Sequence, residues 1–129
     1  MIVVDTHVVF WLAQVPSMLT DPAQAAITEA RRRGGVAISD KTLWELAMMV
    51  SRKQVHVKTS LQEFLREVEH YFVILPITGA IAERSMGFTA GYPKDPTDRI
   101  IGATALIHGL SLITADQSIR SSGEVPCIW

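Results

Sequence analysis

The sequence predicts an α/β fold with helices on both faces of a mainly parallel central sheet. Short β-branched apolar runs, of which residues 2–4 are the first, alternate with longer amphipathic segments along the chain. These runs carry few alternating polar residues, as is typical of strands that are buried on both faces. A helix-length segment separates each strand from the next, which allows the crossovers that parallel strands need.

Length, composition and charge set the limits of this prediction. The chain has 129 residues, of which 48% are apolar, and this is enough for one compact domain over residues 1–129. Twelve basic and 13 acidic residues give a net charge of −1, so no global positive field would attract nucleic acid. The single cysteine, Cys127, excludes an intrachain disulfide, and we expect its side chain to be buried. No apolar run is long enough to span a bilayer, and no basic segment precedes residues 2–4, so we expect a cytoplasmic protein.

The expected elements follow from apolar period and from capping residues. In chain order they are a strand at 2–4, a helix at 7–14, a helix opened by Thr20-Asp21-Pro22, a strand at 36–38, a helix from 39 to about 54, a helix opened by the capping box at 60–63, a strand at 72–77, a helix at 78–87, a helix at 95–108, a strand at 110–113, a helical turn at 118–122 and an edge strand at 127–129. The arginine triplet at 31–33 has two interpretations, a solvated helix C-terminus or a contact to phosphate or to a partner.

The stretch from Asp95 to Asp116 is the most informative part of the sequence. Asp95 can cap the free amides of a first helical turn, Pro96 suits the first helical position, and Asp98 adds a negative charge that the helix dipole favours. The strand at 110–113 then ends close to Asp116, just as the strand at 2–4 ends at Asp5. Functional groups in parallel sheets gather outside the C-terminal ends of the strands, so we expect both aspartates there.

Glu45 extends this acidic set. It lies in the second turn of a helix that follows the strand at 36–38, so its helix starts near the same sheet edge as Asp5. Taken alone, Glu45 fits a surface or salt-bridged residue. Beside three aspartates expected at one edge, we interpret it as a member of a cluster of four carboxylates: Asp5, Glu45, Asp98 and Asp116.

Such a cluster requires compensation, because like charges raise one another's pKa and a buried unpaired carboxylate is strongly disfavoured. Either a bound cation or a basic side chain would supply it. All-oxygen sites favour Mg²⁺ or Mn²⁺, and the histidines of this chain lack zinc-like spacing. An acidic pocket that holds such ions can activate water and stabilise the charge on a phosphate, which predicts phosphodiester hydrolysis.

Several neighbours of the carboxylates are candidates for substrate binding. Thr6, Thr114 and Ser118 can hold metal-bound waters or phosphate oxygens, although backbone capping explains each hydroxyl as well. Arg99 and Arg120 can contact substrate phosphates or can form plain ion pairs with a neighbouring carboxylate.

Four segments taken together resemble the PIN-domain ribonucleases, specifically the VapC-type toxins of toxin-antitoxin pairs. The segments are Ile2-Val3-Val4-Asp5-Thr6-His7, residues 39–47, Asp95-Pro96-Thr97-Asp98-Arg99 with residues 101–105, and Thr114-Ala115-Asp116. The resemblance covers nearly the whole chain in the expected order.

The resemblance implies a Mg²⁺- or Mn²⁺-dependent endoribonuclease that is often homodimeric and is inhibited by a VapB-type antitoxin. By position, Asp5, Glu45, Asp98 and Asp116 match the acidic quartet of the family. Asp5 and Asp98 are the expected direct metal ligands, whereas Asp95 is expected to cap its helix, with support of the metal ligands as the alternative. A rival interpretation is a PIN-like domain that has become an inactive binding or scaffold module.

Overall fold

The computed structural model describes all residues from 1 to 129. Its five strands form one parallel sheet in the order β3-β2-β1-β4-β5. The strands are β1 (Ile2–Val4), β2 (Val36–Ser39), β3 (Val73–Leu75), β4 (Leu112–Ile113) and β5 (Cys127–Ile128). The helices are α1 (Thr6–Gln14), α2 (Asp21–Arg32), α3 (Asp40–Ser51), α4 (Leu61–Tyr71), α5 (Gly79–Ser85), α6 (Pro96–His108) and α7 (Gln117–Ser122), and a 3₁₀ turn lies at Pro16–Met18. The predicted α/β fold with a parallel sheet is confirmed.

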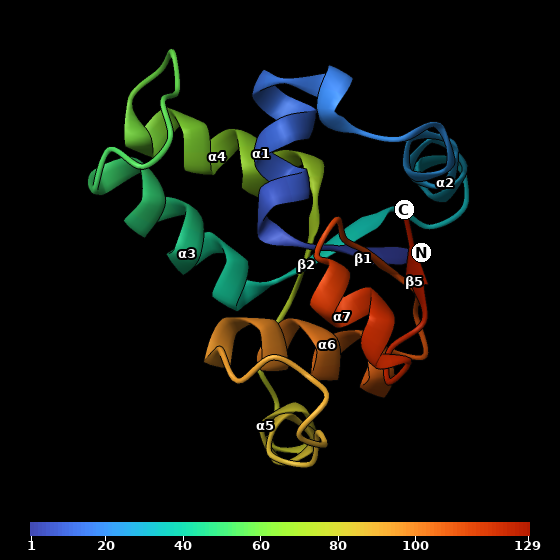
Figure 1. Cartoon of the computed structure of the whole chain (residues 1–129). Coiled ribbons are helices and arrows are strands. Elements are labelled where there is room, and N and C mark those ends of the chain that lie inside the picture. The colour runs from blue at the N-terminus through green and yellow to red at the C-terminus, as the bar shows by residue number, and fades with distance from the viewer.

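Two apolar cores lie on opposite faces of this sheet, because neighbouring residues of each strand point to opposite sides. Ile2 and Val4 of β1 belong to one core with side chains from α1, α2, α3 and α4. Val3, between them, belongs to the other core, which α5, α6 and α7 complete. Figure 1 shows the same layers, with α1, α2 and α4 on one side of the strands and α5 and α6 on the other.

The sheet edges differ slightly from the sequence prediction. β3 ends at Leu75, two residues early, because Pro76 has no amide hydrogen and the amide of Ile77 donates instead to Asp40 Oδ2 at 3.2 Å. β5 is an edge strand, as predicted, and pairs with β4 alone. Cys127 is only partly buried at this edge, and its thiol donates to the carbonyl of Val125 at 3.1 Å.

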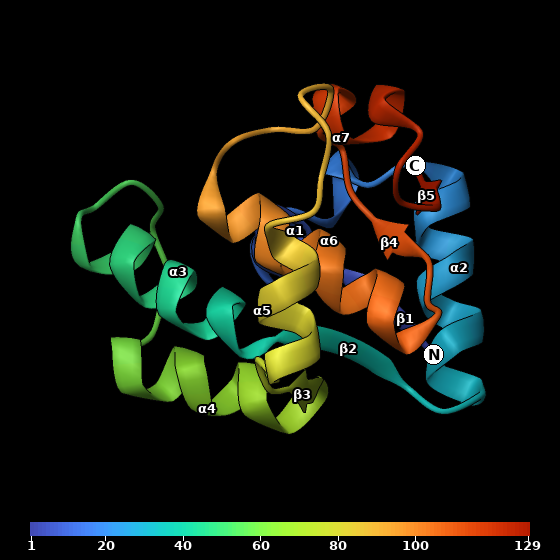
Figure 2. The same ribbon diagram turned by 90° about the horizontal axis from the view of Figure 1, so that it is seen from below.

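Helix α6 crosses the middle of one sheet face and begins near the C-terminal ends of the strands. Figure 2 shows it beside α5, with α3 and α4 side by side on the left of that view and α3 in contact with α6. Gly102 lets the helix pack closely, since a methyl group there would lie 2.9 Å from Tyr92 Cζ and 3.1 Å from Phe88 Cζ. Because Tyr92 lies this close to α6, its hydroxyl donates a hydrogen bond to the carbonyl of Asp98 at 2.8 Å.

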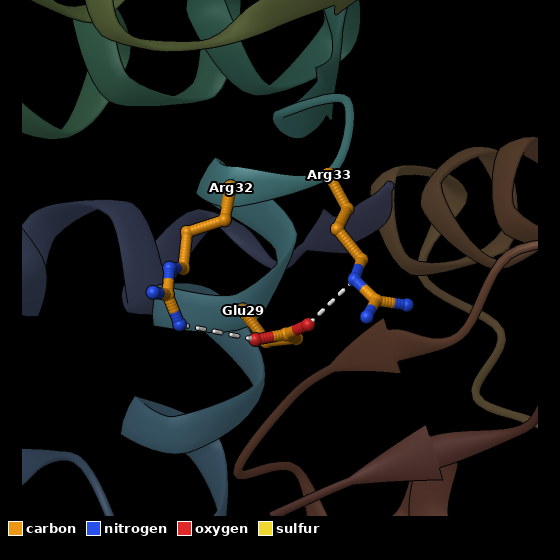
Figure 3. Close-up of polar contacts among 3 residues, drawn as sticks. All are labelled: Glu29, Arg32 and Arg33. Carbon is orange, nitrogen blue, oxygen red and sulfur yellow. Dashed lines mark ion pairs between the residues drawn. The ribbon is translucent and has the colours of Figure 1, made fainter.

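The arginine triplet closes α2 as a solvated helix end. Glu29 Oε1 lies 2.7 Å from Arg33 Nε, and Glu29 Oε2 lies 3.8 Å from Arg32 Nη1 (Figure 3). The arginine side chains are 76% and 80% exposed, so these contacts are surface ion pairs. None of the helices has the length and hydrophobicity that crossing a bilayer requires.

Candidate active site

A pocket of about 390 Å³ collects acidic side chains from four separate segments of the chain. Its lining consists of Asp5, His7, Trp11, Glu45, Asp95, Asp98, Ala115 and Asp116. The pocket lies where β1 and β4 end, which is the point at which the strand order changes direction. All four carboxylates of the predicted cluster therefore meet at one place, and Asp95 joins them.

Local structure explains how each acidic residue reaches the pocket. Asp5 follows β1 and caps α1, and Asp116 follows β4 and caps α7 through a 3.1 Å bond from the amide of Ile119. Glu45 lies in the second turn of α3. Each of these three helices starts at the C-terminal edge of the sheet, so the parallel topology brings Asp5, Glu45 and Asp116 together. Asp95 and Asp98 reach the pocket because the start of α6 packs at the same edge.

Asp5 is the most firmly held of the carboxylates. Its Oδ1 accepts a hydrogen bond from the amide of Thr6 at 2.8 Å, and its Oδ2 accepts one from Thr114 Oγ1 at 2.7 Å. Only 9% of the residue is exposed. Burial raises the pKa of Asp5 above its ordinary value, against the lowering effect of the two hydrogen bonds.

Thr114 links the two aspartates that follow strands. It is fully buried, and while its hydroxyl donates to Asp5 it also accepts a bond from the amide of Asp116 at 3.1 Å. A single hydroxyl thus fixes the orientation of Asp5 and the backbone that carries Asp116. Thr114 is a positioning residue for the pocket.

The first turn of α6 contributes two carboxylates with different surroundings. Asp95 Oδ1 accepts bonds from the amides of Thr97 at 2.8 Å and Asp98 at 3.2 Å, so the predicted capping role is confirmed. Asp98 has no hydrogen-bond donor from the protein at its carboxylate. Burial, and then the charges of the surrounding pocket carboxylates, raise the pKa of Asp98 to about 7.

No ion pair neutralises this pocket, although His7 lines it and the charge of His7 partly lowers the pKa of Asp5. The two ion pairs of the whole chain are both formed by Glu29, far from the acidic residues. Arg99 donates from Nε to the carbonyl of Pro93 at 2.9 Å, and Arg120 donates from Nη2 to the carbonyl of Ala115 at 3.5 Å. The alternative in which these arginines form ion pairs with neighbouring carboxylates is therefore excluded.

The donor set fits a hard divalent cation. Its donors are carboxylate oxygens, most of them free of hydrogen bonds from the protein, and burial together with neighbouring carboxylates raises the pKa values of Asp5 and Asp98. No three acidic, histidine or cysteine side chains are close enough together to hold a metal ion as a complete set of protein ligands. Mg²⁺ does not require one, because it keeps several waters and binds through a few carboxylates.

Comparison with known proteins agrees with this geometry. The family model described as the PIN domain matches residues 2–124. The chain belongs to the PIN-domain family. Over 120 residues this PIN domain is 30% identical to Ribonuclease VapC22 of Mycobacterium tuberculosis, and the match covers 93% of this chain and 90% of that protein.

Solved structures with the same fold include a toxin-antitoxin complex from Klebsiella pneumoniae. The PIN domain superposes on it with a TM-score of 0.64 at 27% identity, covering 90% of this chain and 87% of the other. VapBC2 from Rickettsia felis, bound to a DNA fragment from its promoter, gives a TM-score of 0.75 at 16% identity, covering 98% and 97% of the two chains. At that identity the second likeness shows the fold alone.

The residues predicted to bind substrate are spread around the pocket and do not line it. Thr6 is fully buried, and its hydroxyl lies 3.3 Å from that of Thr42. Ser118 and Arg120 are exposed on α7, and Arg99 lines a separate cavity beside α6. Their substrate roles stay predictions, and the burial of Thr6 leaves its hydroxyl no access to a bound RNA.

Two aromatic lining residues of the PIN domain went unrecognised in the sequence. His7 and Trp11 are one helical turn apart on α1, and their ring centroids are 5.9 Å apart. Trp11 also packs against Trp129, with their ring centroids 5.8 Å apart, and it is half-buried. The i, i+4 spacing directly after Asp5 was the available indication.

Proposed function

We propose that this PIN domain is a metal-dependent endoribonuclease that hydrolyses RNA phosphodiester bonds as the toxin of a toxin-antitoxin pair. One observation carries the proposal: five carboxylates from four separate segments line one pocket, and no basic side chain of the protein is paired with them. The relatedness to a protein named Ribonuclease VapC22 and the likeness to a toxin-antitoxin complex support the choice of RNA and of the toxin role.

In this proposal Asp5 and Asp98 hold Mg²⁺ or Mn²⁺ most directly, and Glu45 and Asp116 complete the site. When bound, such an ion supplies activation of water and neutralisation of charge on the scissile phosphate. Thr114 keeps Asp5 in its orientation through the 2.7 Å hydrogen bond. Asp98, with a pKa of about 7, gives up a proton when it becomes a ligand.

The inactive scaffold is the weaker interpretation on energetic grounds. Keeping Asp5 and Asp98 buried beside three further carboxylates raises their pKa values and destabilises the folded protein at neutral pH. A module that only binds or bridges partners gains nothing from this repulsion. A metal-dependent hydrolase needs the clustered carboxylates, because they are its metal ligands.

The partners of the proposed toxin are RNA, a VapB-type antitoxin and a second copy of the chain, all in the cytoplasm. An antitoxin tail that carries arginine would neutralise the acidic pocket. Met48, Met49, Met86 and Phe88 are apolar candidates for the surface that contacts the second copy: Met86 is 82% exposed, Met48 is half-buried, and Met49 and Phe88 are buried. Of these, only Met86 is exposed.

Cleavage of labelled RNA with and without divalent metal tests the proposed activity. We expect cutting with Mg²⁺ or Mn²⁺, none in excess chelator, and none for Asp5→Ala or Asp98→Ala with metal present. Glu29→Ala, which removes a carboxylate from the surface ion pairs, is the matched control and should cut like the wild type. Equal cleavage in chelator would refute the metal mechanism.

Thermal unfolding gives a second test that does not depend on RNA. A ligand that binds only the folded state stabilises it, by about 2.7 kcal/mol at 100 times its dissociation constant. We expect millimolar Mn²⁺ to raise the melting temperature of the wild type and of Glu29→Ala, but not that of Asp98→Ala. An unchanged melting temperature of the wild type would count against a metal site.

A further inference from the structure

A second cavity, of opposite charge, lies on the other side of the first turn of α6. It measures about 300 Å³ and lies against α5 and α6. Its lining consists of Ser85, Met86, Lys94, Pro96, Arg99 and Ile100. This basic groove contains two cationic side chains and no acidic one, whereas the neighbouring pocket contains five carboxylates.

Helix geometry explains why the two sites adjoin. Asp95 and Asp98 are three residues apart and line the acidic pocket, while Pro96 and Arg99, also three apart, line the basic groove. Successive residues of a helix are rotated by about 100°, so Asp98 and Arg99 point to adjacent faces of one turn. A strand that crosses the start of α6 would contact both sites.

The cations of the groove have no paired carboxylate. Neither Lys94 nor Arg99 takes part in an ion pair, because both ion pairs of the chain involve Glu29. A third cation, Arg84, adds to the local charge: its Cζ lies 4.6 Å from the centroid of the Phe88 ring, and that of Arg99 lies 6.0 Å from the same ring.

One carboxylate, that of Glu124, partly offsets the positive charge of the groove. The carboxylate of Glu124 accepts two hydrogen bonds from Thr89, one from the backbone amide at 3.0 Å and one from the side-chain hydroxyl at 2.8 Å. These bonds are the main reason that the pKa of Glu124 is lowered, and the charges of Arg84 and Arg99 add to the effect. Arg84 and Arg99 thus lie near one carboxylate that is already bonded to Thr89.

Arg99 is held ready for a ligand. Its Nε donates to the carbonyl of Pro93 at 2.9 Å, which fixes the guanidinium, and its two terminal nitrogens have no hydrogen-bond partner in the protein. A planar fork with two free donors matches two phosphate oxygens. Lys94, on the exposed loop just before α6, can add a point charge beside it.

We propose that Lys94 and Arg99, with Arg84 behind them, bind backbone phosphates of the RNA strand next to the bond that is cut. This inference rests on the proposed ribonuclease function. The acidic pocket repels a polyanion and the chain has a net charge of −1, so RNA needs a local basic site. Adjacency to the acidic pocket favours RNA over an acidic peptide as the ligand. Contacts of this kind are independent of base sequence.

Charge reversal at Lys94 tests the subsite, with Lys58→Glu as the matched control. Both lysines are exposed and lie in loops, but Lys58 belongs to the segment between α3 and α4 and does not line the basic groove. We expect Lys94→Glu to raise the KM for a single-stranded RNA about 5- to 10-fold with kcat unchanged, and to reduce the slope of log affinity against log salt by about 0.7 for each phosphate that the variant no longer neutralises. Lys58→Glu should change neither quantity.

The possible outcomes separate this inference from the function on which it rests. A wild type that cuts no RNA defeats the ribonuclease proposal itself. A wild type that cuts RNA, with equal KM values for Lys94→Glu and Lys58→Glu, overturns the subsite alone. A loss confined to kcat overturns it too, because Lys94 would then act on the acidic pocket. Polyglutamate that competes as strongly as RNA of equal length would assign the groove to an acidic peptide.

Discussion

Two groups of charged residues in this molecule show opposite solutions to the same electrostatic problem. On α2, Glu29 lies between Arg32 and Arg33 in exposed ion pairs, where water already screens the charges (Figure 3). At the C-terminal edge of the sheet, Asp5 and Asp98 are buried or half-buried beside further carboxylates, and no cation is paired with them. The paired group is energetically almost neutral, whereas the unpaired group destabilises the fold. A cost of this kind persists where the site needs it for function.

The largest effect on this contrast should come from the hydroxyl that holds Asp5. Thr114→Val removes the 2.7 Å hydrogen bond to Asp5 and the one from the amide of Asp116. Loss of a group that orients a metal ligand costs about 10- to 100-fold in metal affinity or activity. We expect a loss of that size in Mn²⁺-dependent RNA cleavage, measured as kcat/KM.

Thr104→Val is the matched control for that substitution. Thr104 is also fully buried, but its hydroxyl donates to the carbonyl of Ile100 at 2.7 Å, within α6 and away from the carboxylates. It should therefore cut RNA at nearly the wild-type rate. If both valine variants lose activity equally, Thr114 matters for packing alone and has no special role at Asp5.

The next effect concerns the stability of the metal-free protein against pH. The pKa of Asp98 is about 7 in the folded protein against 3.8 for the free side chain, so between these values the folded state binds the proton more tightly than the unfolded state. The free energy of unfolding should fall as the pH rises from about 4 to about 7, and this loss should be complete above the folded pKa. The raised pKa of Asp5 acts in the same direction.

Asp98→Asn should flatten this dependence, because asparagine carries no titrating charge. In chelator at pH 8 we expect its melting temperature to exceed that of the wild type by several degrees, as follows from a stabilisation of about 1–2 kcal/mol. Calorimetry at pH 5 and pH 8 would measure it. A wild type that is equally stable at both pH values, without metal, contradicts the proposed repulsion.

The smallest effect should come from the paired group on α2. Glu29→Gln weakens both surface ion pairs, which are worth about 0.5 kcal/mol or less each. We expect a change in the free energy of unfolding below about 1 kcal/mol by denaturant titration, and a smaller change still in high salt. A larger loss of unfolding free energy would mean that the surface ion pairs contribute more to stability than their exposure indicates.

The strand-end aspartates and the α6 cap were predictable because their causes are local. Asp5 and Asp116 follow buried apolar runs, and Asp95-Pro96 marks a helix start through capping and ring geometry. The place of Glu45 in the cluster was predictable only because three aspartates were expected at the same sheet edge. A glutamate in an amphipathic helix usually faces solvent. The sheet edges were less predictable, since β3 ends where Pro76 and the bond from Ile77 to Asp40 end it.

Local sequence pattern does not show that Trp11 and Asp95 both line the acidic pocket. Trp11 fits an apolar helix face in sequence, and only the packing of α1 against the C-terminal Trp129 turns one side of it toward the carboxylates. Asp95 satisfies its capping role completely through Oδ1. Its presence in the pocket depends on where the start of α6 comes to lie relative to β1 and β4.

The sequence by itself determined the parallel α/β class, the starts of the helices and the identity of the four carboxylates, because apolar period and capping act over a few residues. Only the tertiary structure decided that no arginine neutralises those carboxylates, that Thr114 joins Asp5 to the backbone of Asp116, and that a basic groove lies across one turn of α6 from an acidic pocket. These features depend on distances between residues far apart in the chain. Such distances are fixed by how the helices pack on the sheet.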